Sequence, residues 1–186
     1  MRRRDCNCMV AAAWVAVALS TAVGAQAQET IDQENLPSGT VSYVSCGVGP
    51  GSLSQGFTPS LSPLSAVELM MYSPPAGTRI VRIRSGAVDG PVVAEASAEN
   101  QAGWTRYQLP IAVAVVPGQL YVIEYVYATP VAYIAMNNAD TYAGGHGYGC
   151  TNNSNPGLDI VFRTYAGASL PTRPVTWGSL KSLYVD

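Results

Sequence analysis

Residues 119–127 read QLYVIEYVY, and their apolar side chains repeat with a period of two. In an extended strand, this spacing places Tyr121, Ile123 and Tyr125 on one face and leaves a leucine and valines on the other. Because both faces are largely apolar, the segment is predicted to be a central strand. The aromatic row favours a cross-strand packing ladder, with an aromatic binding platform as the alternative.

The same period extends in both directions along the chain. In residues 78–84 (TRIVRIR), Val81 and Ile83 are predicted to face the core, and Arg82 and Arg84 to face solvent. Pro-Gly and Asp-Gly pairs, which suit tight turns, separate such segments. The predicted strands are residues 41–46, 54–58, 66–72, 79–85, 92–98, 105–109, 112–116, 119–127, 131–136 and 158–165. This density of short strands indicates two packed sheets or a barrel, and we expect an all-β antiparallel sandwich of two sheets over residues 40–166.

Residues 1–27 have the pattern of a signal peptide: three arginines, an apolar run at 9–23, and small residues up to Ala27. The run is shorter than the roughly 20 residues that a membrane-spanning helix needs. We therefore expect a secreted, extracellular or periplasmic protein with no transmembrane segment after cleavage. The polar residues 28–39 are predicted to form a flexible leader.

Residues 167–186 are predicted to form a linker and a short C-terminal helical tail. Trp177, Leu180 and Tyr184 recur at three- and four-residue steps, so they would share one helix face. Such a short helix is marginal alone. The tail is therefore expected to dock on the sandwich or on a protein partner.

Cleavage after residue 27 removes three arginines and one aspartate, which leaves seven basic and eleven acidic residues and a net charge of about −4. This balance argues against nucleic acid as a partner. Cleavage also leaves two cysteines, Cys46 and Cys150. In an oxidising compartment they are expected to form a disulfide, the alternative being two separate thiols.

Several segments together resemble a jelly-roll β-sandwich module of bacterial extracellular proteins, similar to galactose-binding-like and carbohydrate-binding modules. They are residues 32–35 (DQEN), 55–59 (QGFTP), 81–86 (VRIRSG), 103–105 (GWT), 117–124 (PGQLYVIE), 142–145 (YAGG) and 159–165 (DIVFRTY). The resemblance implies a jelly-roll topology and a secreted or cell-surface location. Such modules often hold a structural calcium ion, which Asp32, Asn35 and Asp159 would bind through oxygen atoms.

Residues 137–157 form a long segment rich in Asn, Gly and Tyr, and loops of this length are uncommon unless they are functional or disordered. Aromatic rings suit stacking on a sugar, and amides suit its hydroxyl groups. The alternative is a plain surface loop. The predicted ligand-binding residues are Tyr142, His146, Tyr148, Asn152 and Asn153.

The sequence offers few candidate catalytic residues, because His146 is the single histidine and no Gly-x-Ser-x-Gly motif is present. The sequence therefore favours a non-catalytic secreted module that binds a glycan or cell-surface polymer, without a cofactor apart from the calcium ion considered above. The alternative is a structural or adhesive surface protein that contacts other proteins.

Overall fold

A computed structural model describes residues 28–44, 51–72, 77–127, 133–149, 154–155 and 157–167. Within these ranges, all helix and strand elements are β-strands, and all strand pairs are antiparallel. The prediction of an all-β protein with two antiparallel sheets is confirmed. The predicted signal peptide, the helical tail, and the two cysteines lie outside the described residues.

One sheet has six strands in the order β11-β10-β3-β8-β5-β6. Strand β8 lies between β3 and β5, which confirms the prediction that residues 119–127 contain a central strand. The bounds are β3 (Gly51–Phe57), β5 (Thr78–Ser85), β6 (Val92–Glu99), β8 (Tyr121–Tyr127), β10 (Gly147–Tyr148) and β11 (Ser154–Asn155).

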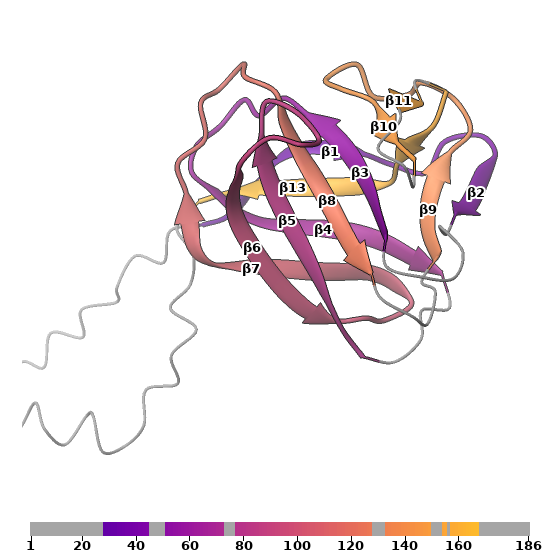
Figure 1. The fold of residues 1–186 in the computed structure, drawn as a ribbon, viewed down its shortest axis with the longest axis horizontal. Helices are drawn as coiled ribbons and strands as arrows, with labels where there is room; N and C mark the ends of the chain where they lie inside the picture. The colour runs from indigo at the N-terminus through magenta and orange to yellow at the C-terminus, as the bar shows by residue number, and fades with distance from the viewer. Residues whose placement is uncertain are drawn as a thin grey trace, which may run out of the picture.

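The other sheet has seven strands in the order β1-β13-β4-β9-β12, with β7 beside β4 and β2 beside β9. Figure 1 shows β3, β8, β5 and β6 crossing in front of β13, β4 and β7, so that two layers are stacked. The bounds are β1 (Thr30–Asn35), β2 (Val41–Val44), β4 (Leu64–Tyr72), β7 (Gly103–Val113), β9 (Tyr133–Asn137), β12 (Asp159–Ile160) and β13 (Phe162–Ala166).

The core lies between the two sheets and is made by alternate residues of their strands. Val81 and Ile83 are fully buried, as the alternation in β5 predicts. Tyr125 is also fully buried and packs edge-on against Tyr107, with ring centroids 6.5 Å apart. Tyr121 and Tyr125 are both buried and therefore serve core packing.

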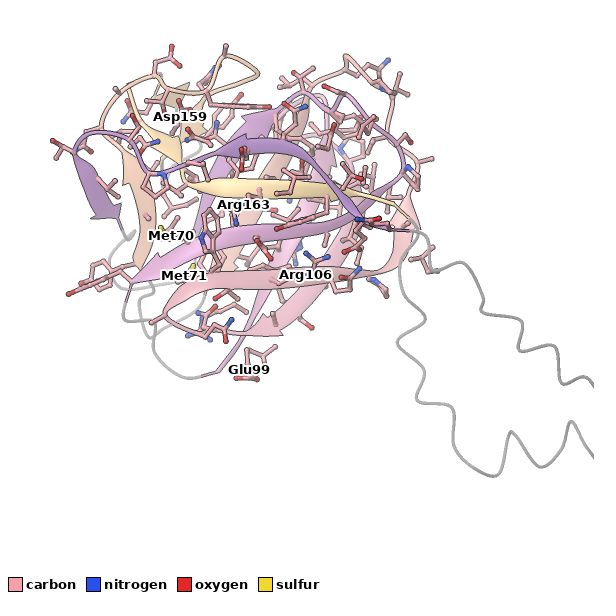
Figure 2. All side chains as sticks on the ribbon, turned by 180° about the vertical axis from the view of Figure 1, so that it is seen from behind. Met70, Met71, Glu99, Arg106, Asp159 and Arg163 are labelled. Carbon is pink, nitrogen blue, oxygen red and sulfur yellow. The ribbon has the colours of Figure 1, made fainter. Side chains whose placement is uncertain are left out.

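The outer face of the seven-stranded sheet carries a lattice of arginines and aromatic rings centred on Glu68. Arg163 lies over the ring of Trp104 and Arg106 over that of Tyr165, each with its guanidinium carbon 4.3 Å from the ring centroid. Glu68 lies between the two arginines, 3.5 Å from Arg106 and 3.8 Å from Arg163, and accepts a 2.6 Å hydrogen bond from the Tyr165 hydroxyl. Figure 2 shows both arginines on this face.

Two predictions about strands are wrong. The predicted flexible leader, residues 28–39, contains β1, which pairs with β13 along its length. The strands predicted at 105–109 and 112–116 are not separate, because β7 continues through Pro110 and ends at Val113, which leaves residues 114–116 outside the strand. A proline is tolerated there because β7 is an edge strand, where the missing N–H need not reach a neighbour.

Candidate functional site

The loop that follows β9 is held by the buried carboxylate of Asp159. One oxygen accepts hydrogen bonds from the backbone N–H groups of Thr141 at 2.8 Å and Tyr142 at 2.9 Å. The other accepts one at 3.0 Å from the side-chain amide of Gln55 in β3, on the opposite sheet. Gln55 in turn accepts a 2.7 Å hydrogen bond from the backbone N–H of Ile160. The two sheets and the loop are therefore joined through one buried polar network.

A second set of amide hydrogen bonds fixes β1 to the same loop. Asn35 donates to the carbonyl oxygen of Ile160 at 2.8 Å. Asn137 donates to Asn35 Oδ1 at 3.2 Å and to the hydroxyl of Thr141 at 3.0 Å. Asn35 and Asn137 are at most 5% exposed. Both amides therefore hold the loop in place, and in this structure Asn137 does not face solvent as a ligand-binding amide would.

Tyr142 was predicted to offer a stacking face, and the structure corrects this assignment. Its ring is 8% exposed and packs edge-on against Phe162, with centroids 5.0 Å apart. Its hydroxyl donates to Gln33 Oε1 at 2.9 Å and accepts from the backbone N–H of Thr58 at 3.4 Å. Burial raises the pKa of the Tyr142 phenol above its ordinary value. Tyr142 is part of the core because an aromatic ring beside an apolar surface gains more from burial than from exposure.

Two glycines let the loop pass close to neighbouring main chain. The backbone N–H of Gly56 donates to the carbonyl of His146 at 2.9 Å. A Cβ atom on Gly145 would lie 2.3 Å from the carbonyl oxygen of Gly56, and one on Gly147 would lie 2.2 Å from that of Leu158. No larger residue fits at either glycine without movement of the main chain. The positions of the flanking residues are therefore tightly defined.

The predicted site residues that the structure brings together at the surface are His146 and Tyr148. Their ring centroids are 5.0 Å apart with the planes inclined by 40°, and both residues are partly exposed. Within the described residues, no carboxylate or hydroxyl forms a hydrogen bond with the His146 ring. The pair is thus an exposed aromatic surface at the end of the six-stranded sheet.

Tyr148 begins a row of side chains that crosses the outer face of this sheet. Tyr148 pairs with Ser54, Ser54 with Glu124, Glu124 with Arg82, and Arg82 with Glu95. Directly paired residues project from the same face of a sheet. Since Val81 and Ile83 point into the core, this row points away from it.

The inner part of this row is polar and strongly desolvated. Ser54 is fully buried, and its hydroxyl has no hydrogen-bond partner among the described residues. Glu124 is 8% exposed, and its Oε2 accepts a 2.9 Å hydrogen bond from Arg84 Nε. Sequence analysis missed both residues, because strand alternation marks them as outward-facing but cannot show that neighbours cover them.

The residues predicted to bind calcium do not form one cluster of carboxylates. Asp32 accepts hydrogen bonds from the backbone N–H groups of Ser60 at 3.0 Å and Leu61 at 2.9 Å. Asn35 and Asp159 both contact Thr141, through its hydroxyl and its backbone N–H respectively. The described part of the chain contains no group of three or more His, Cys, Asp or Glu residues placed to hold a metal ion. The protein's own donors occupy the oxygen atoms named here.

Other predicted site residues, Asn152 and Asn153, and the predicted Cys46–Cys150 disulfide lie outside the described residues. The described part contains no helix with the length and hydropathy of a membrane-spanning segment. Comparison with known protein families, curated proteins and solved structures gives no match to this chain.

Proposed function

We propose that this chain is a secreted, non-catalytic binding module for a glycan or a polyhydroxylated cell-surface polymer. The observation that carries the proposal is the partly exposed His146–Tyr148 pair at the end of the polar row on the six-stranded sheet. A sugar ring has an apolar face that stacks on aromatic rings and an edge of hydroxyl groups that needs polar partners. The pair and the row offer these two chemistries side by side.

The polar row supports the proposal through its hydrogen-bonding capacity. The accessible part of the row is Arg82, which is partly exposed, and Glu95, which is exposed. Carboxylates such as Glu95 accept hydrogen bonds from hydroxyl groups, and guanidinium groups such as Arg82 donate to them, whereas Ser54 and Glu124 are covered by their neighbours. In this proposal, the rings hold the ligand against the sheet and the row fixes its orientation. The predicted contributions of Asn152 and Asn153 belong to the same proposal.

Rigidity also supports a binding role. The loop carrying the ring pair is held by Asp159, by Asn35 and by the close approach of Gly145 to β3. A surface whose residues are already fixed loses little conformational entropy when a ligand binds. The loop is therefore suited to binding without rearrangement.

The proposed jelly-roll topology rests on the order of eight strands. In one layer β1, β13, β4 and β7 are neighbours, and in the other β3, β8, β5 and β6 are neighbours. Along these eight strands the chain changes layer at every step except from β5 to β6, which are neighbours in one layer, and this order supports the two Greek keys of a jelly roll. The topology is compatible with secreted binding modules, whose functions differ by the residues placed on a shared fold.

The test is a glycan-array screen of the purified protein with and without calcium, followed by calorimetry on any glycan that binds. Tyr148→Ala is expected to weaken binding about tenfold or more, which corresponds to roughly 1.4 kcal/mol. The matched control is Tyr133→Ala, because Tyr133 is also exposed but lies on the other sheet. Equal affinity in the wild-type protein and Tyr148→Ala would refute the assignment of the site. No binding to any glycan would refute the ligand class.

A structural or adhesive role in contacts with other proteins is the second candidate. The observation that favours it is an open edge strand, β6, at the far side of the same sheet. The two functions can be separated, because β6 and β10 lie at opposite ends of the strand order.

A further inference from the structure

Strand β6 forms one edge of the six-stranded sheet and pairs with β5 alone. It is eight residues long, and an edge strand of this length presents a row of main-chain groups to an incoming strand. The opposite edge, β11, has two residues. The β6 edge is therefore the longer template for strand addition in this sheet.

The register identifies which main-chain groups point outward from β6. Asn100 N–H donates to the carbonyl of Gly77 at 3.3 Å, in continuation of the pairing between Thr78 and Glu99. In an antiparallel pair, residues alternate between those bonded to the partner strand and those directed away from it. The even-numbered residues 94–98 therefore bond to β5. Main-chain groups of Glu95, Ser97 and Glu99 point to the open edge.

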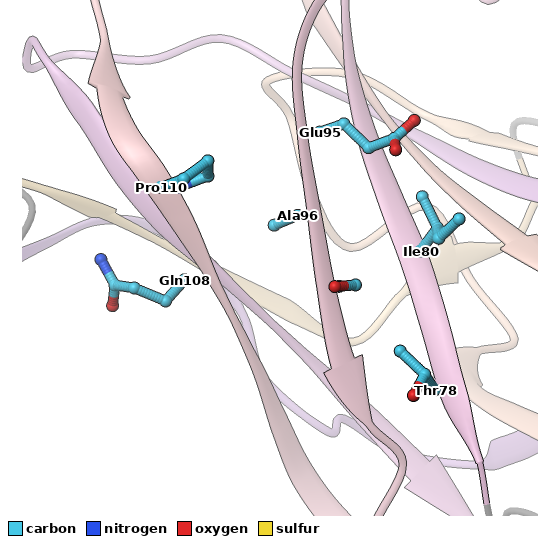
Figure 3. Close-up of a pocket in the computed structure, with 7 residues that line it drawn as sticks. Thr78, Ile80, Glu95, Ala96, Gln108 and Pro110 are labelled. Atoms are coloured by element: carbon cyan, nitrogen blue, oxygen red, sulfur yellow. The ribbon is translucent and has the colours of Figure 1, made fainter. Parts of the chain in front are cut away.

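A cleft of about 500 Å³ runs along this edge, between β6 and β7. Figure 3 shows Glu95, Ile80 and Thr78 on one side of β6, and Gln108 and Pro110 of β7 across from it. Within the described residues, no backbone hydrogen bond joins β6 to β7. Glu95 and Ser97, two of the residues whose main-chain groups point outward, line this cleft.

Charge defines the chemistry of the segment that fits this edge. The row Glu124, Arg82, Glu95 alternates in sign, and Arg82 Nε lies 2.8 Å from Glu95 Oε2. Glu99 adds a second carboxylate on the same face, where it contacts the hydroxyl of Thr78. A cationic side chain on an added strand would continue the alternation next to Glu95. Opposite charges directly across a sheet are stabilising.

A second copy of β6 would meet its own charges in the register centred on Ser97. Antiparallel pairing about Ser97 would place Glu95 of each copy opposite Glu99 of the other, because the two glutamates lie two residues to either side. Like charges directly opposite each other are destabilising. Self-pairing in this register is therefore disfavoured.

We propose that β6 binds an extended cationic peptide segment of another protein by strand addition. The main-chain groups of Glu95, Ser97 and Glu99 form the ladder with the peptide, and the two carboxylates select lysine or arginine side chains. The binding mode is β-augmentation, in which backbone hydrogen bonds give affinity and alternate side chains give specificity.

The test measures fluorescence anisotropy of a labelled peptide of about nine residues, with alternating valine and threonine and two lysines four positions apart. Ser97→Pro removes the outward N–H at the centre of the edge, and proline is tolerated at such positions because the bonds to β5 are unaffected. We expect Ser97→Pro to weaken binding at least about tenfold and the matched control Ser97→Ala to leave it unchanged. Equal binding by Ser97→Pro and Ser97→Ala would overturn the proposal.

A charge reversal tests the same edge without altering the main chain. Glu99→Lys is expected to bind the lysine peptide more weakly and to prefer a peptide in which only the lysine opposite residue 99 is replaced by glutamate, because Glu95 still favours the other lysine. The lysine peptide with N-methylated alternate amides should not bind. The proposal would be contradicted if Glu99→Lys kept the peptide preference of the wild-type protein, or if the N-methylated peptide bound as tightly as the unmodified one. It would also be contradicted if the wild-type protein formed dimers that are absent in Ser97→Pro. If residues 168–186 are protected from proteolysis in the wild-type protein but not in Ser97→Pro, the edge binds the chain's own tail. That result would also overturn the proposal.

Discussion

Replacement of Asp159 by alanine is expected to destabilise the fold by about 3–5 kcal/mol, because it leaves three donors without their acceptor and each buried unsatisfied group costs about 1–3 kcal/mol. The carboxylate is fully buried and accepts three hydrogen bonds, from Gln55, Thr141 and Tyr142. Hydrogen bonds to a charged group contribute about 1.5–3 kcal/mol each, and relief from burying a carboxylate offsets part of their sum. A loss of this size is a large share of the roughly 5–15 kcal/mol that stabilises a typical domain.

Urea unfolding followed by tryptophan fluorescence measures this loss. With a slope of about 2 kcal/mol/M, the midpoint should fall by roughly 2 M in Asp159→Ala. Asp159→Asn keeps the shape and one acceptor oxygen, so it should fall about half as far. Asp89→Ala, which removes an exposed carboxylate, should stay within about 0.5 kcal/mol of the wild-type protein. A loss below about 1 kcal/mol in Asp159→Ala, or unchanged hydrogen exchange of the Thr141 and Tyr142 amides, would refute the proposed role of the carboxylate.

Three further predictions concern the tyrosines and one glycine. The folded-state pKa of Tyr142 is raised, so the stability that its neutral phenol contributes is complete below the ordinary tyrosine pKa of about 10 and is lost as pH rises through the folded-state pKa. Urea titrations of Tyr142→Phe should therefore show a shallower loss of stability at alkaline pH than those of the wild-type protein. Near neutral pH, Tyr142→Phe should be less stable by about 1 kcal/mol because of the lost hydrogen bond. Burial, and then the hydrogen bond and charge of Glu68, raise the pKa of Tyr165, so Glu68→Gln should lower that pKa, measured by phenolate absorbance. Gly145→Ala should destabilise the protein by about 1–3 kcal/mol through its overlap with the main chain of β3. Gly157→Ala should not, because its Cβ would meet Asn155 Oδ1 at 3.7 Å, an ordinary contact; equal denaturation midpoints for the two variants would contradict this account.

The sandwich could be predicted where hydropathy alone decides the structure. Tyr121, Ile123 and Tyr125 alternate without interruption, and strand alternation is a direct consequence of backbone geometry. Strand β1 was not recognised, because Gln33 and Asn35 are polar and their value to the fold lies in hydrogen bonds to distant residues. No local pattern reports those partners.

The candidate site could be predicted in part for the same reason. The glycine-rich composition of residues 137–157 indicated a loop of interest, and His146 and Tyr148 do form a surface pair. Composition could not distinguish Tyr142 from these two, since burial depends on Phe162 and on the network around Asp159. Pro110 led to the prediction of a break between two strands where β7 is continuous. Whether a proline interrupts a strand depends on whether the strand lies at the edge of its sheet, which the local sequence does not show.

The position of β13 determines the order in which the chain can fold. This strand ends the described part of the sequence, yet it lies between β1, which begins it, and β4. The first strand can join the sheet only after nearly the whole domain has been synthesised. Contacts between such distant segments slow folding. A fragment that lacks β13 therefore lacks the strand with which β1 pairs.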